Sequence, residues 1–342
     1  NNGSLTVSVT QTDTAGNTSD PASTTITLDN QAPAAPSIST PIEIDNIVNA
    51  SEDDTVLISG SGAEPNASLT ITVGSVSIQT TADSNGDWTI ESNELDISAL
   101  NNGSLTVTVT QTDAAGNESS SATQGITLDN TAPDAPVINT PIESDGIVNA
   151  AEDADVLITG SGAEANASVT VTITDGVNSL DQTVTADGSG NWTASGSEFD
   201  VSSFTNGSLT VSVTQTDTAG NTSAAATQNI TLDNSTPGAV TIITPIEVDG
   251  LVNAAEDENV LIAGSGAEAN ASVTVTITDG ANSLDQTVTA DGSGNWTVSG
   301  SEFDVSAFNN GTLTVTATQT DAAGNTSTAS TQDITLDNSA PS

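Results

Sequence analysis

Lysine, arginine and histidine are all absent from this chain of 342 residues, although it contains 45 aspartates and glutamates and carries a formal net charge of −45. Without basic side chains, the chain can offer no catalytic histidine, no Schiff-base lysine and no cationic group that grips a nucleic-acid backbone. No carboxylate can be neutralised by a side chain of the same molecule. We therefore expect no nucleic-acid partner and a surface that attracts cations from solution.

Cysteine is also absent, so disulfide bonds cannot stiffen the fold as they do in many extracellular proteins. No apolar run is long enough for a transmembrane helix, and no positively charged signal region stands at the start, so direct membrane insertion is not expected. High charge with low hydrophobicity is typical of disorder, but 34% of the residues are hydrophobic and they follow regular patterns. We therefore predict that the chain folds and that a bound metal ion stiffens it.

Internal repetition defines the domain organisation. The segment at residues 1–17 recurs with few changes, and its glycines at positions 3, 103, 207 and 311 lie 100 or 104 residues apart. Proline-containing LDN strings mark the linkers. The predicted boundaries are 1–30 for the C-terminal part of a preceding repeat, 31–130 for repeat 1, 131–234 for repeat 2, 235–338 for repeat 3 and 339–342 for the start of the next linker. Each complete repeat holds fourteen acidic residues, so the charge belongs to the repeating unit.

Each repeat has the pattern of β-strands. Leu105, Val107 and Val109 alternate with threonines, which is the period of a half-buried strand, and no helical period is sustained. In repeat 2 the predicted strands are 137–141 (strand A), 156–159, 169–173, 182–186, 191–193 and 229–232. About seven short strands and one tryptophan per repeat predict an all-β fold of tandem immunoglobulin-like antiparallel β-sandwiches, stacked end to end as a rod. The core is the expected place of Trp88, Trp192 and Trp296.

The acidic residues fall in the loops between these strands. In such a sandwich the A–B loop (143–153 in repeat 2) lies at the C-terminal end of its repeat. The B–C loop, which contains Glu164, and the F–G loop (216–221), which carries the T-D-x-A-G-N string, lie at the N-terminal end. Stacking would bring the acids of consecutive repeats together at each junction. Between repeats 2 and 3 these are Glu143, Asp145, Glu152, Asp153, Asp233, Glu268 and Asp321, and between repeats 1 and 2 they are Glu43, Asp45, Glu52, Asp53, Asp129, Glu164 and Asp217. The equivalent residues at the outer ends are Asp29, Glu64, Asp113, Glu247, Asp249, Glu256, Asp257 and Asp337.

Carboxylates gathered in this way repel one another unless a hard cation joins them. Ca²⁺ takes six to eight oxygen ligands in flexible geometry, so we predict Ca²⁺ at the junctions with these acids as its candidate ligands. Asp, Asn and Gly also favour turns without any metal, and solvated turn formers are the alternative interpretation. If strand A is divided differently, the A–B acids would instead act within one repeat.

A second acidic pattern is found in each repeat. Asp83, Asn85, Asp87 and Glu94 have the spacing of EF-hand ligands, and the spacing recurs from Asp187 to Glu198 and from Asp291 to Glu302. The position that an EF-hand gives to glycine is tryptophan, and strand patterns lie on both sides. We therefore predict a β-hairpin turn. Every pair of acids that could serve as general acid and base recurs in every copy, so no catalytic residue is expected.

Four motifs together carry a resemblance. They are the LDN-x-AP linker, the P-I-E-x-D-x-[IL]-V-N-A-x-E-D loop, a hairpin ending in Gly-[DN]-Trp, and the string V-x-x-T-D-x-A-G-N-x-S. This set resembles the bacterial immunoglobulin-like extender repeats of giant calcium-dependent surface adhesins, which are typically exported by type I secretion and often end in RTX repeats. The resemblance implies a non-enzymatic stalk at the bacterial cell surface, stiffened by Ca²⁺ at its linkers, that projects a distal ligand-binding region. Asp129, Asp233, Asp217 and Asp321 occupy the matching linker and loop positions.

Two other functions are compatible with the residues. The repeats could bind glycans directly, although only 2% of the chain is aromatic, or they could associate sideways into a cell-surface or biofilm-matrix filament. The expected partners are therefore the neighbouring repeats of the same chain, with lateral self-association as the alternative. The motifs do not specify the distal ligand.

Overall fold

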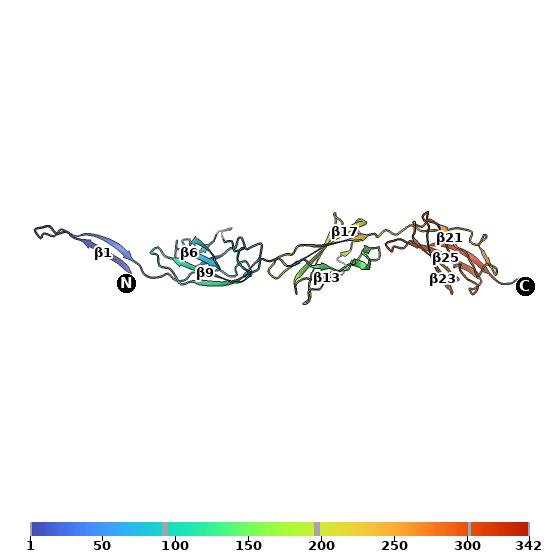
Figure 1. The fold of residues 1–342 in the computed structure, drawn as a ribbon, viewed down its shortest axis with the longest axis horizontal. Helices are drawn as coiled ribbons and strands as arrows, with labels where there is room; N and C mark the ends of the chain where they lie inside the picture. Colours follow the sequence, from blue (N-terminus) through green and yellow to red (C-terminus); the bar gives the residue numbers. More distant parts are fainter. Residues whose placement is uncertain (1, 91–94, 195–198, 300–301, 341–342) are drawn as a thin grey trace. The chain divides into compact units, whose positions relative to one another are not determined.

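The computed structural model describes residues 2–90, 95–194, 199–299 and 302–340. The chain divides into two compact units, Asn1–Asp134 with Thr216–Ala224, and Ala135–Gln215 with Ala225–Ser342. Over the described ranges the regular structure consists of β-strands and one short 3-10 turn (Figure 1). In this part of the chain no helix is long and apolar enough to cross a membrane.

The first unit contains a two-stranded ribbon and repeat 1. Its strands are β1 (Gly3–Val9), β2 (Ala22–Leu28), β3 (Ser37–Ile38), β4 (Ile47–Val48), β5 (Ser59–Ser61), β6 (Ser68–Val73), β7 (Val76–Thr81), β8 (Trp88–Thr89), β9 (Gly103–Thr112) and β10 (Ala122–Leu128). The ribbon pairs β1 with β2. Repeat 1 has a five-stranded sheet of order β4-β10-β9-β6-β7 and a three-stranded sheet of order β3-β5-β8, and β9 lies beside β6 in Figure 1.

The second unit repeats this topology twice. In repeat 2 the elements are β11 (Val137–Ile138), the 3-10 turn η1 (Ile142–Ser144), β12 (Ile147–Val148), β13 (Ile158–Ser161), β14 (Ser168–Thr174), β15 (Ser179–Thr185), β16 (Trp192–Ala194), β17 (Gly207–Thr216) and β18 (Ala226–Leu232). In repeat 3 they are β19 (Thr241–Ile242), β20 (Leu251–Asn253), β21 (Ala263–Ser265), β22 (Ser272–Thr278), β23 (Ser283–Thr289), β24 (Trp296–Thr297), β25 (Gly311–Thr320) and β26 (Ser330–Asp337).

The alternating sequence explains the sandwich. Along β14 the side chains of Val169, Val171 and Ile173 are fully buried, while the intervening threonines stay half-exposed. Apolar side chains from the five-stranded and three-stranded sheets meet in one core per repeat. Burying each such side chain contributes about 1.5–3 kcal/mol. The predicted all-β fold of tandem immunoglobulin-like sandwiches is confirmed.

The tryptophans lie in these cores as predicted, because Trp88, Trp192 and Trp296 are only 2–3% exposed. Each packs against a glycine of the neighbouring strand. A Cβ atom on Gly160 would lie 2.0 Å from Cζ2 of Trp192 and 2.1 Å from the carbonyl oxygen of Val137. The indole therefore occupies the space that any other residue at this position would need.

The stretch after strand A departs from the prediction. Strand A was expected to reach residue 141, but β11 ends at Ile138 and the chain then crosses to the other sheet, where β12 pairs in parallel with β18. During the crossing Ile142 enters the core, and Glu143 and Ser144 adopt left-handed backbone angles. The sheet is thus not purely antiparallel, and the expected A–B loop contains a strand. Strand β13 also begins two residues later than expected.

Candidate metal centre

The T-D-x-A-G-N loop, which joins the last two strands of each repeat, is built on an aspartate that caps its own turn. In repeat 1, Oδ1 of Asp113 accepts hydrogen bonds from the backbone N–H groups of Ala115 (2.8 Å) and Asn117 (2.9 Å). Its Oδ2 accepts one from Nδ2 of Asn117 (2.8 Å). These donors, the Asn117 amide foremost, lower the pKa of Asp113 from its ordinary value of 3.8. Three of about four lone-pair sites are used, so one remains for a cation.

The same bonds recur in the other two repeats. Asp217 accepts from Ala219 and Asn221, and Asp321 accepts from Ala323 and Asn325. Turn formation, the alternative interpretation, is therefore part of the role of these three aspartates.

A buried glutamine connects the segments at the N-terminal end of the repeat through hydrogen bonds. Gln111 is 1% exposed, its Oε1 accepts from the N–H of Glu64 (2.7 Å) and its Nε2 donates to the carbonyl oxygen of Ala34 (2.7 Å). Gln319 makes the same pair of bonds in repeat 3. The linker and the B–C loop are thus held to the last strands. Sequence reasoning missed this residue, although a glutamine at an inward position of an alternating strand was a visible signal.

The linker, the B–C loop and the T-D-x-A-G-N loop place three carboxylates around one cavity. Asp29, Glu64 and Asp113 line a space of about 300 Å³ in the first unit. Glu268 and Asp321 line a space of about 290 Å³ in the second. Oδ1 of Asp29 accepts from the N–H of Gln31 (3.1 Å), whereas the Glu64 carboxylate has no hydrogen bond within the described residues. This cavity is the best candidate site for a cation.

The acids of the A–B stretch act inside their own repeat. In repeat 2, Glu143 accepts from the N–H of Leu157, Asp145 from that of Ile147 and Glu152 from that of Asn149. Their equivalents make the same bonds, namely Glu43, Asp45 and Glu52 in repeat 1 and Glu247, Asp249 and Glu256 in repeat 3. These carboxylates accept backbone hydrogen bonds from their own repeat, the first glutamate from an N–H group fourteen residues further along the chain.

The last acid of the same stretch is buried against the linker. Asp53, Asp153 and Asp257 are 6–8% exposed. Each accepts a hydrogen bond from the linker asparagine of its own repeat, Asn130, Asn234 or Asn338, at 2.7, 2.9 and 3.1 Å. The linker aspartates Asp129 and Asp233 bond in turn to Asn102 and Asn206. These amide contacts fasten the linker to the repeat that precedes it.

Within the residues that the structure describes, no group of three carboxylates lies close enough together to hold one metal ion. The donor chemistry nevertheless fits Ca²⁺, because carboxylate and carbonyl oxygens are what this hard cation prefers. A shared ion would have to draw the side chains that line the cavity toward one another.

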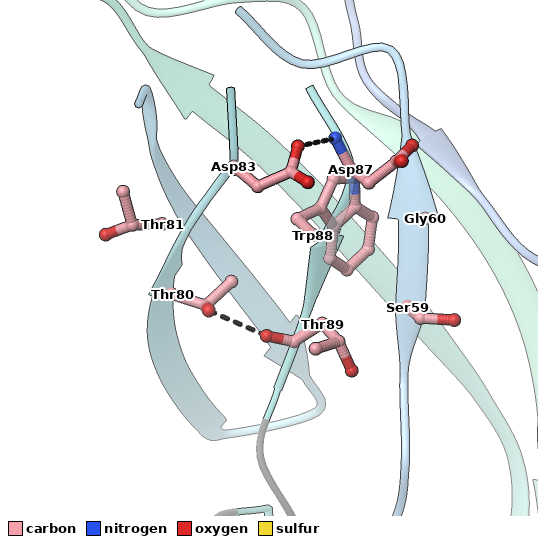
Figure 2. A pocket seen from close by; sticks show the side chains of 8 residues that line it. All are labelled: Ser59, Gly60, Thr80, Thr81, Asp83, Asp87, Trp88 and Thr89. Carbon is pink, nitrogen blue, oxygen red and sulfur yellow. Dashed lines mark hydrogen bonds between the residues drawn. The ribbon is translucent and has the colours of Figure 1, made fainter. Parts of the chain in front are cut away.

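The EF-hand-like segment forms a tight turn, but the predicted β-hairpin is wrong, because β7 belongs to the five-stranded sheet and β8 to the three-stranded sheet. Oδ1 of Asp83 accepts from the N–H groups of Asn85 (2.7 Å) and Asp87 (2.9 Å), and Figure 2 shows the second of these bonds. Asp83, Asp87 and Trp88 also line a cavity of about 440 Å³. Since Trp88 is buried, its ring offers no exposed platform for a sugar. Glu94 and Glu198 lie outside the described residues.

One protein-family profile matches three consecutive segments of the chain. The family profile described as bacterial Ig-like domain matches residues 34–130, 140–234 and 249–338. No curated protein matches.

Solved structures give further matches. One is a Ca²⁺-stabilised adhesin that helps an Antarctic bacterium reach out and bind ice, at 29% identity over 98% of this chain and 82% of that chain, with a TM-score of 0.48. Another belongs to a 1.5-MDa bacterial ice-binding adhesin, at 28% identity over 91% and 100% of the two chains, with a TM-score of 0.39. A tetra-tandem repeat from the extending region of a large adhesion protein is 28% identical over 99% and 82%, with a TM-score of 0.33.

Proposed function

Because this chain belongs to the bacterial Ig-like domain family, with three consecutive matches, we propose that it is a calcium-rigidified extender of a large bacterial surface adhesin. In this proposal the repeats stack as a non-enzymatic rod outside the cell and project a distal ligand-binding region. The supporting observation is the cavity at the N-terminal end of repeat 1, where Asp29, Glu64 and Asp113 face one space in a chain without basic residues.

The proposed ligands come from three segments. Ca²⁺ would be held by the linker aspartate, the B–C glutamate and the remaining lone pair of the loop aspartate. In the sequence the equivalent positions are Asp129, Glu164 and Asp217, and Asp233, Glu268 and Asp321, of which the last three all lie in the second unit. The A–B acids rank below these sets, because their carboxylates already accept backbone hydrogen bonds within their own repeat, and so does Asp337, which accepts from the N–H of Ser339. The ion would neutralise charge and cross-link the linker to two loops.

The free energy of binding one ion is large enough to stiffen a linker. An ion present at 100 times its dissociation constant stabilises the form that binds it by about 2.7 kcal/mol. Without the ion, carboxylate repulsion acts only locally, because the Debye length at physiological salt is about 8 Å. Each linker would therefore lose the contribution of its ion independently of the others when calcium is removed.

Calcium removal tests the proposal directly. We expect EGTA to lower the melting temperature by about 10 °C and to shorten the longest dimension of the particle in small-angle X-ray scattering. Replacing Ca²⁺ by Mg²⁺ should restore little, because Mg²⁺ demands a compact octahedral site and dehydrates reluctantly. Identical melting and scattering profiles with and without Ca²⁺ would falsify the proposal.

A paired substitution tests the ligand set. Glu64→Gln removes one carboxylate charge from the cavity and should lower the calcium stoichiometry measured by titration calorimetry by about one ion per chain. Asp54→Asn is the matched control, since Asp54 is exposed and lines neither cavity. Equal stoichiometry in the two variants removes Glu64 from the proposed site.

A further inference from the structure

An asparagine of repeat 3 is inserted between two segments of repeat 2 within the second unit. Asn325, at the end of the T-D-x-A-G-N loop, is only 4% exposed. Its Oδ1 accepts a hydrogen bond from the N–H of Ala150 (2.8 Å), and its Nδ2 donates to the carbonyl oxygen of Asp233 (2.8 Å). One amide therefore joins both the A–B turn and the linker of the preceding repeat.

The first unit contains the same arrangement. Asn221 is 5% exposed, accepts from the N–H of Ala50 (2.9 Å) and donates to the carbonyl oxygen of Asp129 (2.8 Å). The contact is thus formed at both places where a T-D-x-A-G-N loop faces an A–B turn, with nearly equal distances.

The local structure of the A–B turn explains why an N–H is available. Asn149 caps the turn, because its Oδ1 accepts from the N–H of Ala151 (2.9 Å), and Glu152 bonds back to the N–H of Asn149 (3.1 Å). The two bonds are reciprocal as in a capping box, except that Asn149 accepts from the second residue of the turn and not from the third. The N–H of Ala150, at the first position of the turn, has no partner inside the turn and is free to donate outward.

The side-chain amide of Asn325 complements the two backbone groups that it meets, which we call the receptor. The receptor offers one donor, the Ala150 N–H, and one acceptor, the Asp233 carbonyl. A side-chain amide carries one acceptor oxygen and two N–H donors, so it satisfies both, and its second N–H goes to Asp321 (3.1 Å). An aspartate at the same position would lack the donor.

The neighbouring glycine lets the loop approach. Gly324 has a φ of 93°, and a Cβ atom there would meet Nδ2 of Asn149 at 3.4 Å. At Gly220 the corresponding contact, with Asn49, would be 3.2 Å, whereas Gly116 has no atom within 4 Å. The close approach thus occurs only where an A–B turn faces the loop.

Repeat 1 supplies an internal comparison. Asn117 occupies the same loop position, but residues 1–30 contain no A–B turn. Its Nδ2 reaches the carbonyl oxygen of Asp29 at the longer distance of 3.3 Å, and the residue stays half-exposed. The bond to the linker carbonyl is therefore common to the three copies of the loop.

We infer that the asparagine of the T-D-x-A-G-N loop is a metal-independent lock between consecutive repeats. The A–B turn N–H and the linker carbonyl form the docking surface, and a further repeat of this sequence type is the partner that it fits. All groups that cross the contact are neutral, so the lock does not rest on the calcium proposal.

The test follows the exchange of the Ala150 amide by NMR in the full chain, in EGTA. Asn325→Ala should speed exchange about tenfold, the loss expected for a buried bond and the group left unpaired. Asn117→Ala is the matched control, because it removes the same loop amide from repeat 1, which makes no bond to Ala150, and it should leave the exchange of Ala150 unchanged. Equal exchange of Ala150 in the wild type and in Asn325→Ala overturns the lock.

A second variant removes the donor from the other side. Ala150→Pro deletes the N–H at the first position of a turn, where proline is well tolerated. Because the substitution lies in repeat 2, the loop of repeat 3 keeps its own sequence and bonds. Residual dipolar couplings should report one alignment for repeats 2 and 3 in the wild type and two in this variant. If EGTA alone abolishes the protection of Ala150 in the wild type, the contact depends on metal and the inference is wrong.

Discussion

At the scale of single residues, the carboxylates of this chain are held by N–H dipoles, since no cationic side chain exists to pair with them. Asp175 is the clearest case. It accepts from the backbone N–H groups of Val177, Asn178 and Thr205 at 2.8, 2.6 and 3.1 Å. These donors, that of Asn178 foremost, hold the pKa of Asp175 well below its ordinary value of 3.8. The charged form is thus favoured without any salt bridge.

This predicts a pH-dependent effect of Asp175→Asn. The variant should be less stable than the wild type at neutral pH, because a neutral amide accepts these N–H groups less well. The difference should stay constant while pH remains above 3.8 and shrink as pH falls below it, since the unfolded chain then binds a proton that the folded chain does not. Urea unfolding from pH 7 to pH 3 in EGTA measures this. A stability difference that stays constant down to pH 3 would contradict the prediction.

At the scale of elements, each sandwich depends on a close contact between a glycine strand and the tryptophan strand. In repeat 1 a Cβ atom on Gly60 would lie 2.0 Å from the carbonyl oxygen of Ser37 and 2.3 Å from Cζ2 of Trp88. Backbone cannot move aside cheaply in a three-stranded sheet, so neither contact can relax without displacing β3 or β8.

We therefore expect Gly60→Ala to destabilise repeat 1 by about 3 kcal/mol, the upper part of the range for overpacking. Hydrogen exchange of peptides from repeat 1 measures the loss, because this repeat differs in sequence from the other two. Gly125→Ala is the control, since Gly125 has no atom within 4 Å of its virtual Cβ and lies in β10. A loss of the same size in both variants would show that the tryptophan contact is not responsible.

At the scale of the whole molecule, the net charge of −45 opposes compactness wherever salt does not screen it. Raising NaCl from about 0.01 to 0.15 M shortens the Debye length from about 30 to 8 Å. In EGTA we expect this change to raise the melting temperature by about 5 °C, equivalent to about 1 kcal/mol per repeat. Choline chloride at the same ionic strength should act equally, and a melting temperature insensitive to both salts contradicts the prediction.

Much of the fold could be predicted from the sequence because its determinants are local. Alternating apolar residues such as Val169 and Val171 define strand faces, and the repeated linker strings define the repeating unit. The switch of strand A to the other sheet at Glu143 and Ser144 was missed, because a two-residue strand such as β12 is too short to show alternation. The partner of a short strand is chosen by the sheet edge that it meets.

The sequence by itself determined the class of fold and the tandem organisation, since composition and periodicity are properties of the chain alone. Only the tertiary structure decided which carboxylates are already engaged and which still face a cavity. Asp53 meets Asn130, and Asn325 meets Ala150 at a separation of 175 residues. Alternation in the sequence shows which face of a strand a side chain occupies. The residue that it contacts, which can be far away in the sequence, depends on how the strands and loops are arranged in the fold.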